Sequence, residues 1–92
     1  MRALFELGHV VATPGAIDVM ERHGIHAGEL LRRHASGDWG DLDEDDQREN
    51  DYSITRQLRI LSAYGDEDSD SRLWLITEAD RSVTTILRPE DY

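Results

Sequence analysis

Cysteine and lysine are both absent from this chain, and it contains no long apolar segment. Without cysteine, the chain can form no disulfide, no thiolate metal site and no cysteine nucleophile. A membrane-spanning helix needs ~20 apolar residues in a row, and no such run occurs. Glu6, Gly8 and His9 also interrupt the N-terminal segment, which therefore lacks the apolar core of a signal peptide. We expect a cytoplasmic protein with no membrane partner.

Positive charge is scarce as well. The 92 residues carry 20 Asp and Glu against 10 Arg, which gives a formal net charge of −10. Nucleic acids and anionic membranes are also negatively charged, so we expect them to repel this chain rather than bind it directly. The length suits a single domain, residues 1–92, with a core so small that pairing as a homodimer would help to stabilise it.

The negative charge is concentrated in the middle of the chain. Residues 1–34 hold four acidic residues and four arginines, whereas residues 35–72 hold twelve acidic residues and four arginines. Eight of those acidic residues fall within residues 38–51, where Arg48 is the single basic residue. The first third is therefore neutral, and any electrostatic role belongs to the middle of the chain.

Apolar periodicity and capping residues predict three helices. Thr13 is a typical N-cap, and it precedes a proline and an apolar face that predict a helix over residues 14–23. A second helix is expected over residues 27–35. A third, with Asp43 as its N-cap, is expected over residues 44–57, and its few apolar residues indicate that it lies on the surface.

Alternating apolar residues predict an N-terminal strand or bent pair of extended segments over residues 3–11. Three further strands are expected over residues 58–64, 72–77 and 82–87, joined by short turns into an antiparallel meander. With the N-terminal strand, the meander gives an α+β fold of two layers. In this fold a three- to four-stranded antiparallel sheet packs against two or three short helices.

The acidic run is the strongest chemical signal. Carboxylates spaced along a helix and its preceding loop can imitate the phosphates of a nucleic acid and occupy a basic groove on another protein. Trp39 and Leu42 would then supply apolar anchors within the charge. The alternative is a solvated helix start that contains a packed tryptophan. The predicted partner-binding residues are Asp38, Trp39, Asp41, Asp43, Glu44, Asp45, Asp46, Glu49 and Asp51.

The same run resembles the start of a calcium-binding EF-hand loop, because Asp41, Asp43 and Asp45 alternate. An EF-hand requires glycine at the sixth position and a bidentate glutamate at the twelfth. Asp46 and Tyr52 occupy those positions here, so we expect no such calcium site.

Neither a metal centre nor an enzyme active site is expected. His23, His26 and His34 lie on both sides of a helix end, without cysteine and without a spacing that fixes tetrahedral zinc geometry. His34 is instead expected to border the core. The chain has no nucleophile elbow, no phosphate-binding loop and no dinucleotide-binding motif. We therefore predict no cofactor, no catalytic residue and a function that is not enzymatic.

Residues 77–85 form a second polar cluster with two interpretations. Aspartate and arginine suit a tight hairpin turn, and the threonines suit a strand, which explains every residue structurally. In the functional interpretation, four side chains at the end of the sheet contact a partner. These are Glu78, Asp80, Arg81 and Thr84.

Three segments carry a resemblance to a known family. They are LGHVVATPGA at residues 7–16, GDWG at residues 37–40 with His34 before it, and TEADRSVTTILRPE at residues 77–90. In these segments the chain resembles a family of short acidic proteins of bacterial plasmids and other mobile elements. The resemblance brings no catalytic residue with it. It implies a bacterial, plasmid-related protein that interferes with host defence against incoming DNA.

Charge, size and resemblance together predict a small acidic module that binds another protein. Its partner would have a basic, nucleic-acid-binding surface, and a restriction enzyme or a CRISPR complex would be inhibited by this nucleic-acid mimic. The alternative is a non-catalytic accessory or regulatory protein of plasmid or mobile-element maintenance, which acts through a sheet or helix interface. Affinity that falls steeply with salt would favour the first function, and affinity that changes little would favour the second.

Overall fold

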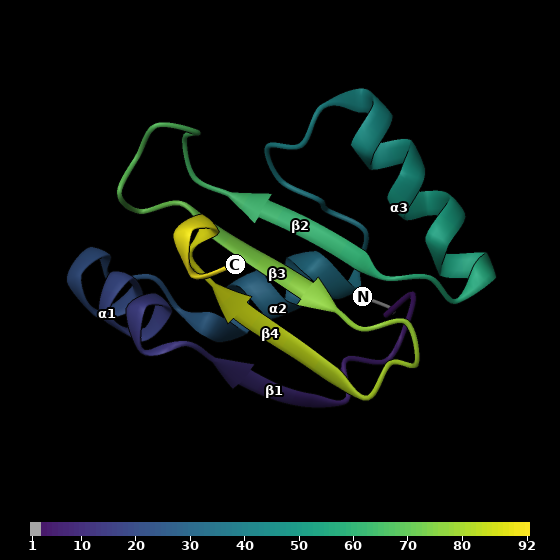
Figure 1. Cartoon of the computed structure of the whole chain (residues 1–92), viewed down its shortest axis with the longest axis horizontal. Coiled ribbons are helices and arrows are strands. Elements are labelled where there is room, and N and C mark those ends of the chain that lie inside the picture. Colours follow the sequence, from purple (N-terminus) through teal and green to yellow (C-terminus); the bar gives the residue numbers. More distant parts are fainter. Residues whose placement is uncertain (1–2) are drawn as a thin grey trace.

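Three α-helices, four strands and a short 3-10 helix make up residues 3–92, the part of the chain that the computed structural model describes (Figure 1). The expected α+β class is confirmed. In chain order the elements are β1 (His9–Ala12), α1 (Pro14–His23), α2 (Ala27–Ala35), α3 (Glu44–Arg56), β2 (Ile60–Tyr64), β3 (Leu73–Thr77), β4 (Val83–Leu87) and η1 (Pro89–Asp91).

The three predicted helices form because their caps and apolar faces are encoded locally. Thr13 Oγ1 accepts a hydrogen bond from the backbone N–H of Ala16 at 3.1 Å and caps α1. Asp43 Oδ1 accepts one from the N–H of Asp46 at 2.9 Å and caps α3. The three acidic residues of the first turn of α3 also lie where the helix dipole favours negative charge.

The strands pair in the order β1-β4-β3-β2. The predicted antiparallel meander of β2, β3 and β4 is confirmed, with Leu75 between Ser62 and Ile86. The prediction of an antiparallel N-terminal strand is wrong, because β1 runs parallel to β4, with Val11 opposite Thr85. A tight turn imposes the antiparallel direction, whereas three helices and two strands separate β1 from β4, so no turn fixes their relative direction.

The N-terminal strand is also shorter than expected, since it starts at His9 rather than at residue 3. Gly8 has a φ of +66°, which breaks the extended backbone directly before β1. The segment before Gly8 runs back to the end of α2, where the backbone N–H of Leu4 donates to the carbonyl of Ala35 at 2.8 Å.

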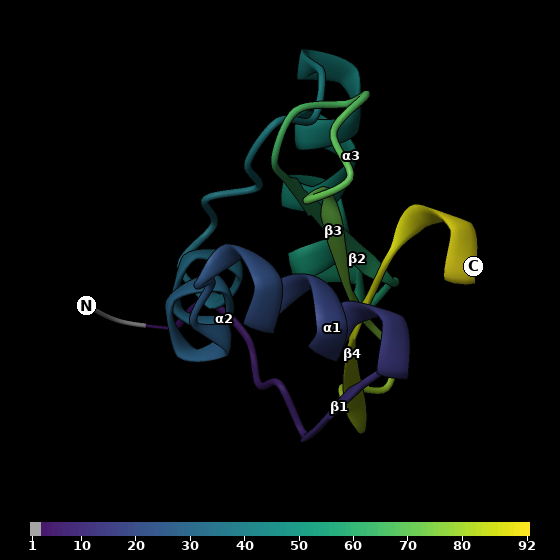
Figure 2. The ribbon, with the colours of Figure 1, turned by 90° about the vertical axis from the view of Figure 1, so that its left-hand side faces the viewer.

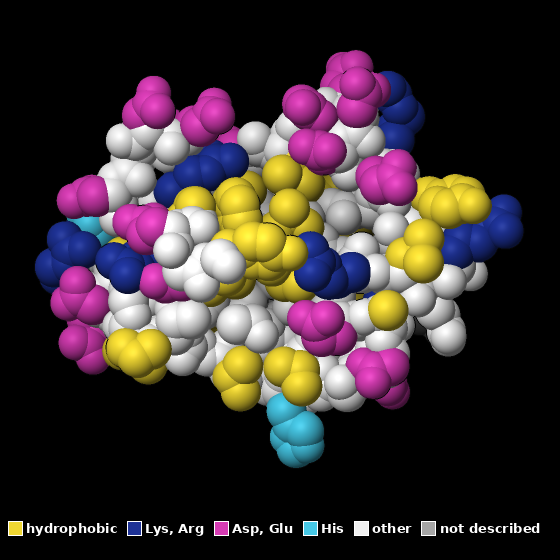
Figure 3. All heavy atoms as spheres, viewed as in Figure 1, with side chains coloured by type: hydrophobic (Ala, Val, Ile, Leu, Met, Phe, Trp, Pro, Cys, Tyr) yellow, Lys and Arg dark blue, Asp and Glu magenta, His cyan; other side chains and the backbone are white. Residues whose placement is uncertain are grey.

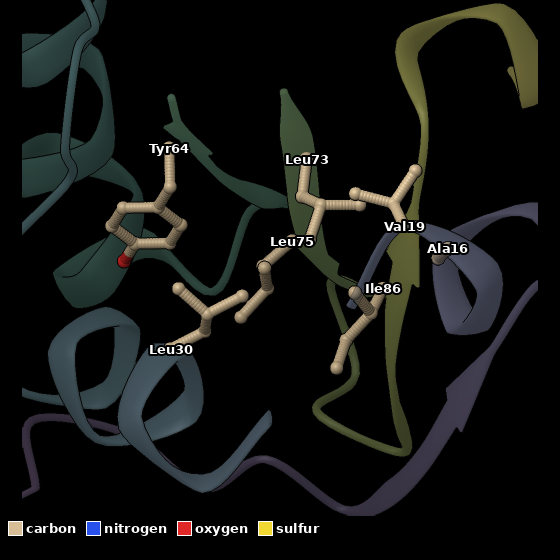
Figure 4. Close-up of a cluster of buried hydrophobic side chains, with 7 residues drawn as sticks. All are labelled: Ala16, Val19, Leu30, Tyr64, Leu73, Leu75 and Ile86. Atoms are coloured by element: carbon tan, nitrogen blue, oxygen red, sulfur yellow. The ribbon is translucent and has the colours of Figure 1, made fainter. Parts of the chain in front are cut away.

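Helices α1 and α2 cover one face of the sheet, while η1 lies on the opposite side (Figure 2). We call that opposite side the open face. Side chains alternate along each strand, so every second residue points into the core between sheet and helices. Seven buried side chains from three strands of the sheet and from these two helices meet there (Figure 4): Ala16, Val19, Leu30, Tyr64, Leu73, Leu75 and Ile86.

The loop before α3 covers part of the edge at β2. The backbone N–H of Ala63 donates to the carbonyl of Trp39 at 3.1 Å, and the N–H of Asp41 donates to the carbonyl of Ala63 at 2.7 Å. Gly40 lies opposite Ala63 in this short parallel bridge. The bridge fixes the start of the acidic run against the sheet.

Candidate functional site

Acidic side chains gather over α3 and over the loop that joins β2 to β3, with apolar side chains of the open face between them (Figure 3). The predicted partner-binding residues all lie on α3 or on the loop before it. They differ in how accessible they are to a partner, because some of them are occupied within the chain.

The most available carboxylates belong to Asp41, Glu44, Asp46 and Glu49, which are exposed and form no ion pair with any residue of the described chain. Asp45 forms an ion pair with Arg48 one turn further along α3. Asp43 is exposed but its carboxylate caps the helix. These charges therefore lie on the first two turns of α3 and on the loop directly before it.

Two of the predicted carboxylates hold the loop in place instead. Asp38 Oδ2 accepts from Arg33 Nε at 2.7 Å, and this hydrogen bond lowers the pKa of the Asp38 carboxyl and raises the pKa of the Arg33 guanidinium. Asp51 Oδ1 accepts from the indole N–H of Trp39 at 3.2 Å. Both carboxylates are thereby partly used for intramolecular bonds.

Trp39 is not accessible as an anchor for a partner, and the structure has the alternative, a packed tryptophan. Its side chain is only 4% exposed and packs against the rings of Phe5 and His34, at centroid distances of 6.2 and 5.9 Å. Burial of a large aromatic ring stabilises the fold because it removes apolar surface from water. The indole N–H stays hydrogen-bonded, since it donates to Asp51. Trp39 is therefore part of the core.

A pocket of about 190 Å³ lies between α3 and β2. Its lining combines Leu42 and Leu61 with the carboxylates of Asp46 and Glu49. Arg59 lines it as well, with its guanidinium donating to the hydroxyl of Tyr92. Asn50 also lines it and holds α3 to the strand, since its amide exchanges hydrogen bonds of 2.6 and 3.1 Å with the backbone of Leu61. An apolar floor with two carboxylates above it suits a long basic side chain, with its stem on the leucines and its charge beside the carboxylates.

The open face supplies aromatic side chains that the sequence reasoning missed. Trp74 is half-buried there, and its ring meets the ring of Tyr92 at a centroid distance of 5.9 Å. Tyr92 is 70% exposed, and its hydroxyl accepts from Arg59 Nη2 at 2.7 Å. The alternation of side chains along β3 could have predicted the position of Trp74. Trp74 lies between Leu73 and Leu75, which point into the core, so its side chain points to the open face.

The polar cluster of the β3–β4 turn is structural in large part. Thr84 is fully buried, so the prediction that it contacts a partner is wrong. Arg81 has a φ of +62°, and its guanidinium donates to the backbone carbonyls of Leu58 at 2.7 Å and Ser53 at 3.1 Å. Asp80 accepts from the N–H of the residue two positions later, as in a turn. Only Glu78 and Asp80 keep exposed carboxylates there.

A buried hydrogen-bonded chain lies at the centre of the fold. His34 Nδ1 meets the hydroxyl of Ser62, and His34 Nε2 lies 2.9 Å from Thr77 Oγ1. Thr77 Oγ1 lies 2.7 Å from Thr84 Oγ1, which donates to the carbonyl of Leu7 at 2.7 Å. All four side chains are 0% exposed. Although Ser62 and His34 are within the reach of a nucleophile and its base, no substrate has access to them.

The last bond of this chain fixes the direction of the others. Because Thr84 gives its proton to the Leu7 carbonyl, it accepts from Thr77, which in turn accepts from Nε2–H of His34. Nδ1 of His34 therefore carries no proton and accepts from Ser62. Burial lowers the pKa of His34 to about 4, in agreement with a neutral ring.

A second hollow, of about 260 Å³, lies between α2 and the sheet and does not form an acid–base site. Its ionisable side chains are Arg33, which is bound to Asp38, and Tyr64, whose hydroxyl donates to the Asp38 carbonyl at 2.7 Å. Burial raises the pKa of Tyr64 to about 12. Neither group is tuned to transfer protons near neutral pH.

Residues 3–92 contain no group of three or more side chains placed to hold a metal ion. None of the helices in that part of the chain has the length and apolar composition needed to cross a membrane. Comparisons with protein-family models, curated proteins and solved structures find no match for this chain. The resemblance to the acidic family of mobile elements therefore stays a prediction.

Proposed function

We propose that this chain is a small, non-enzymatic module that binds another protein through the acidic surface of α3. The observation that carries the proposal is the pocket between α3 and β2, where Asp46 and Glu49 lie beside two leucines and form no ion pair within residues 3–92. Arg59 lines the same pocket, but its guanidinium donates to the hydroxyl of Tyr92 instead of pairing with either carboxylate. Such a pocket is complementary to an arginine or lysine of the partner. Clusters of arginine and lysine side chains are typical of protein surfaces that bind nucleic acid.

The proposed partner is a DNA-handling complex of a host defence system, either a restriction enzyme or a CRISPR complex. The carboxylates of Glu44, Asp46 and Glu49 would occupy contacts that the partner normally makes with phosphates. The formal charge of −10 would attract a basic partner from a distance and speed association. In this proposal the chain inhibits its partner by competing with nucleic acid.

We expect Asp46→Asn combined with Glu49→Gln to weaken partner binding by about a hundredfold or more, because each of the two lost charge pairs at the interface costs about 1.5 kcal/mol or more. Both changes keep the side-chain shape, and neither residue caps a helix. The measurement is plasmid transformation into cells with an active restriction or CRISPR system, with and without the chain. The affinity for an oligo-arginine peptide at low and physiological salt gives a direct readout.

The matched control is Asp66→Asn with Glu67→Gln, which removes the same charge from the loop between β2 and β3. We expect this control to keep most of the inhibition. The proposal is wrong if the wild-type chain leaves both restriction and CRISPR interference unchanged. It is also wrong if the control pair reduces binding as much as the α3 pair does.

The alternative function, an accessory or regulatory protein of plasmid maintenance, is favoured by the aromatic side chains of the open face. Tyr92 is 70% exposed beside Trp74, and exposed aromatic rings often anchor protein interfaces. In this alternative the acidic residues only keep the chain soluble. Tyr92→Ala would then weaken binding, the α3 pair would not, and the affinity would change little with salt.

A further inference from the structure

The sheet has one edge that the described chain leaves open, and that edge is β1. At the opposite edge, the loop before α3 bonds to Ala63 of β2. No segment lies beyond β1 in the ribbon, where it forms the rim of the molecule (Figure 1). His9, Val10 and Val11 are all exposed.

Alternate residues of β1 turn their backbone groups to that open side. The N–H of His9 donates to the carbonyl of Ser82, directly before β4, at 2.9 Å, and the N–H of Thr13 donates to the carbonyl of Ile86 in β4 at 3.0 Å. In a parallel strand the N–H and C=O of one residue point to the same neighbour, and those of the next residue point away. Val11 therefore bonds toward β4, whereas Val10 and Ala12 present their N–H and C=O groups outward.

We propose that β1 pairs antiparallel with β1 of a second copy of this chain, across a two-fold axis at Val11. In this register Val10 of each copy exchanges two hydrogen bonds with Ala12 of the other, which gives four in total. Moving the axis to Val10 would require strand geometry at Gly8, whose φ is +66°. Moving it to Ala12 would require an N–H from Pro14, which has none.

The chemistry of this edge suits a second copy. Val10 and Val11 are 44% and 48% exposed, and neither β1 nor its neighbour β4 contains a charged residue. Two chains of formal charge −10 repel each other, so they can approach most easily where the chain is neutral. Edge strands that remain unpaired usually carry lysine, proline or a bulge, and β1 has none of these.

The register can be tested because the chain has no cysteine of its own. Val11 would face Val11 of the other copy at a Cα distance of about 4.5 Å, which lies within the range for a disulfide. We expect Val11→Cys to cross-link on mild oxidation into a species of twice the 10.5 kDa chain mass. Val10→Cys should cross-link much more slowly, because Val10 faces Ala12. Tyr52→Cys, at a side chain that is 50% exposed on α3, is the matched control.

Sedimentation equilibrium measures the association of the unmodified chain. We expect dimers that become more stable as salt screens the repulsion, whereas binding to a basic partner weakens with salt. Val11→Lys should remain monomeric, and Val10→Pro should too, since it removes an outward N–H and no bond to β4.

The dimer is excluded if the wild-type chain stays monomeric up to about 1 mM, a concentration that detects even millimolar dissociation constants. It is also excluded if Val11→Cys cross-links no faster than Tyr52→Cys. Faster cross-linking of Val10→Cys than of Val11→Cys would overturn the proposed register. None of these results depends on the function proposed for α3.

Discussion

Acidification from neutral pH to about pH 4 is expected to remove about 3 kcal/mol of folding free energy through one side chain, His34. Burial lowers the pKa of His34 to about 4 in the folded chain, against about 6.5 for a histidine in an unfolded chain. Each pKa unit corresponds to about 1.4 kcal/mol. The effect is a large part of the stability of a small domain, which is about 5–15 kcal/mol.

The sign follows from which state binds the proton first. Above about pH 6.5 the ring is neutral in both states, so His34 adds no pH dependence. Between about pH 6.5 and pH 4 the unfolded chain is protonated and the folded chain is not, so stability falls as the pH falls. Below about pH 4 both states carry the proton, and the loss is complete.

Urea unfolding at a series of pH values measures this effect. The amide of His34→Gln can still accept from Ser62 and donate to Thr77, but it does not titrate. We therefore expect the free energy of unfolding of this variant to fall less steeply with decreasing pH than that of the wild type. Every other ionisable group is the same in both proteins, so the remaining pH dependence cancels in the difference. His9→Gln, which alters an exposed histidine, is the matched control.

A second observable keeps this prediction testable if His34→Gln does not fold. In the native wild-type chain, the NMR signals of the His34 ring should stay unchanged until the pH approaches about 4. A ring that titrates near pH 6.5 without unfolding would contradict the buried, neutral state. An equal pH slope in the wild type and in His34→Gln would contradict it as well.

What the sequence could predict was the part of the fold that neighbouring residues encode. The N-caps at Thr13 and Asp43 lie next to the helices that they start, and the structure has both. The direction of β1 depends instead on a partner strand more than seventy residues away, since His9 pairs with Val83. No local pattern carries that information.

The candidate site was predictable in its charge and not in its packing. The run of carboxylates is visible in the sequence, and α3 does present several of them to solvent. The sequence left open whether Trp39 packs in the core or contacts a partner, because burial depends on which surfaces meet. Trp39 is covered by Phe5 and His34, whereas Trp74 lies half-buried on the open face. Likewise, the buried chain through His34 joins elements that no sequence spacing links.

Gly40→Ala is expected to cost about 4 kcal/mol, which is exceptional for the addition of a single methyl group. Gly40 has a φ of +76°, and a Cβ atom there would overlap the backbone carbonyl of Ala63 in β2. Gly24→Ala is the matched control, since Gly24 also has a positive φ, of +64°, but a Cβ there meets nothing within 4 Å. We expect Gly24→Ala to lower the free energy of unfolding by about 1–2 kcal/mol, the cost of placing alanine in the left-handed conformation. Urea unfolding of the two variants separates contact from conformation, and equal losses would contradict the role of the contact.

The same substitution should also expose a second sheet edge. The carbonyl of Trp39 and the N–H of Asp41 hold the loop to Ala63, and both bonds are lost if the added methyl group pushes the loop away. β2 would then present unpaired backbone groups to other chains, as β1 does, and a chain with two open edges can extend into larger assemblies. We therefore expect Gly40→Ala to form species above the dimer in sedimentation experiments. The Gly24→Ala control should not, and a Gly40→Ala chain that associates no further than wild type would show that the loop stays in place.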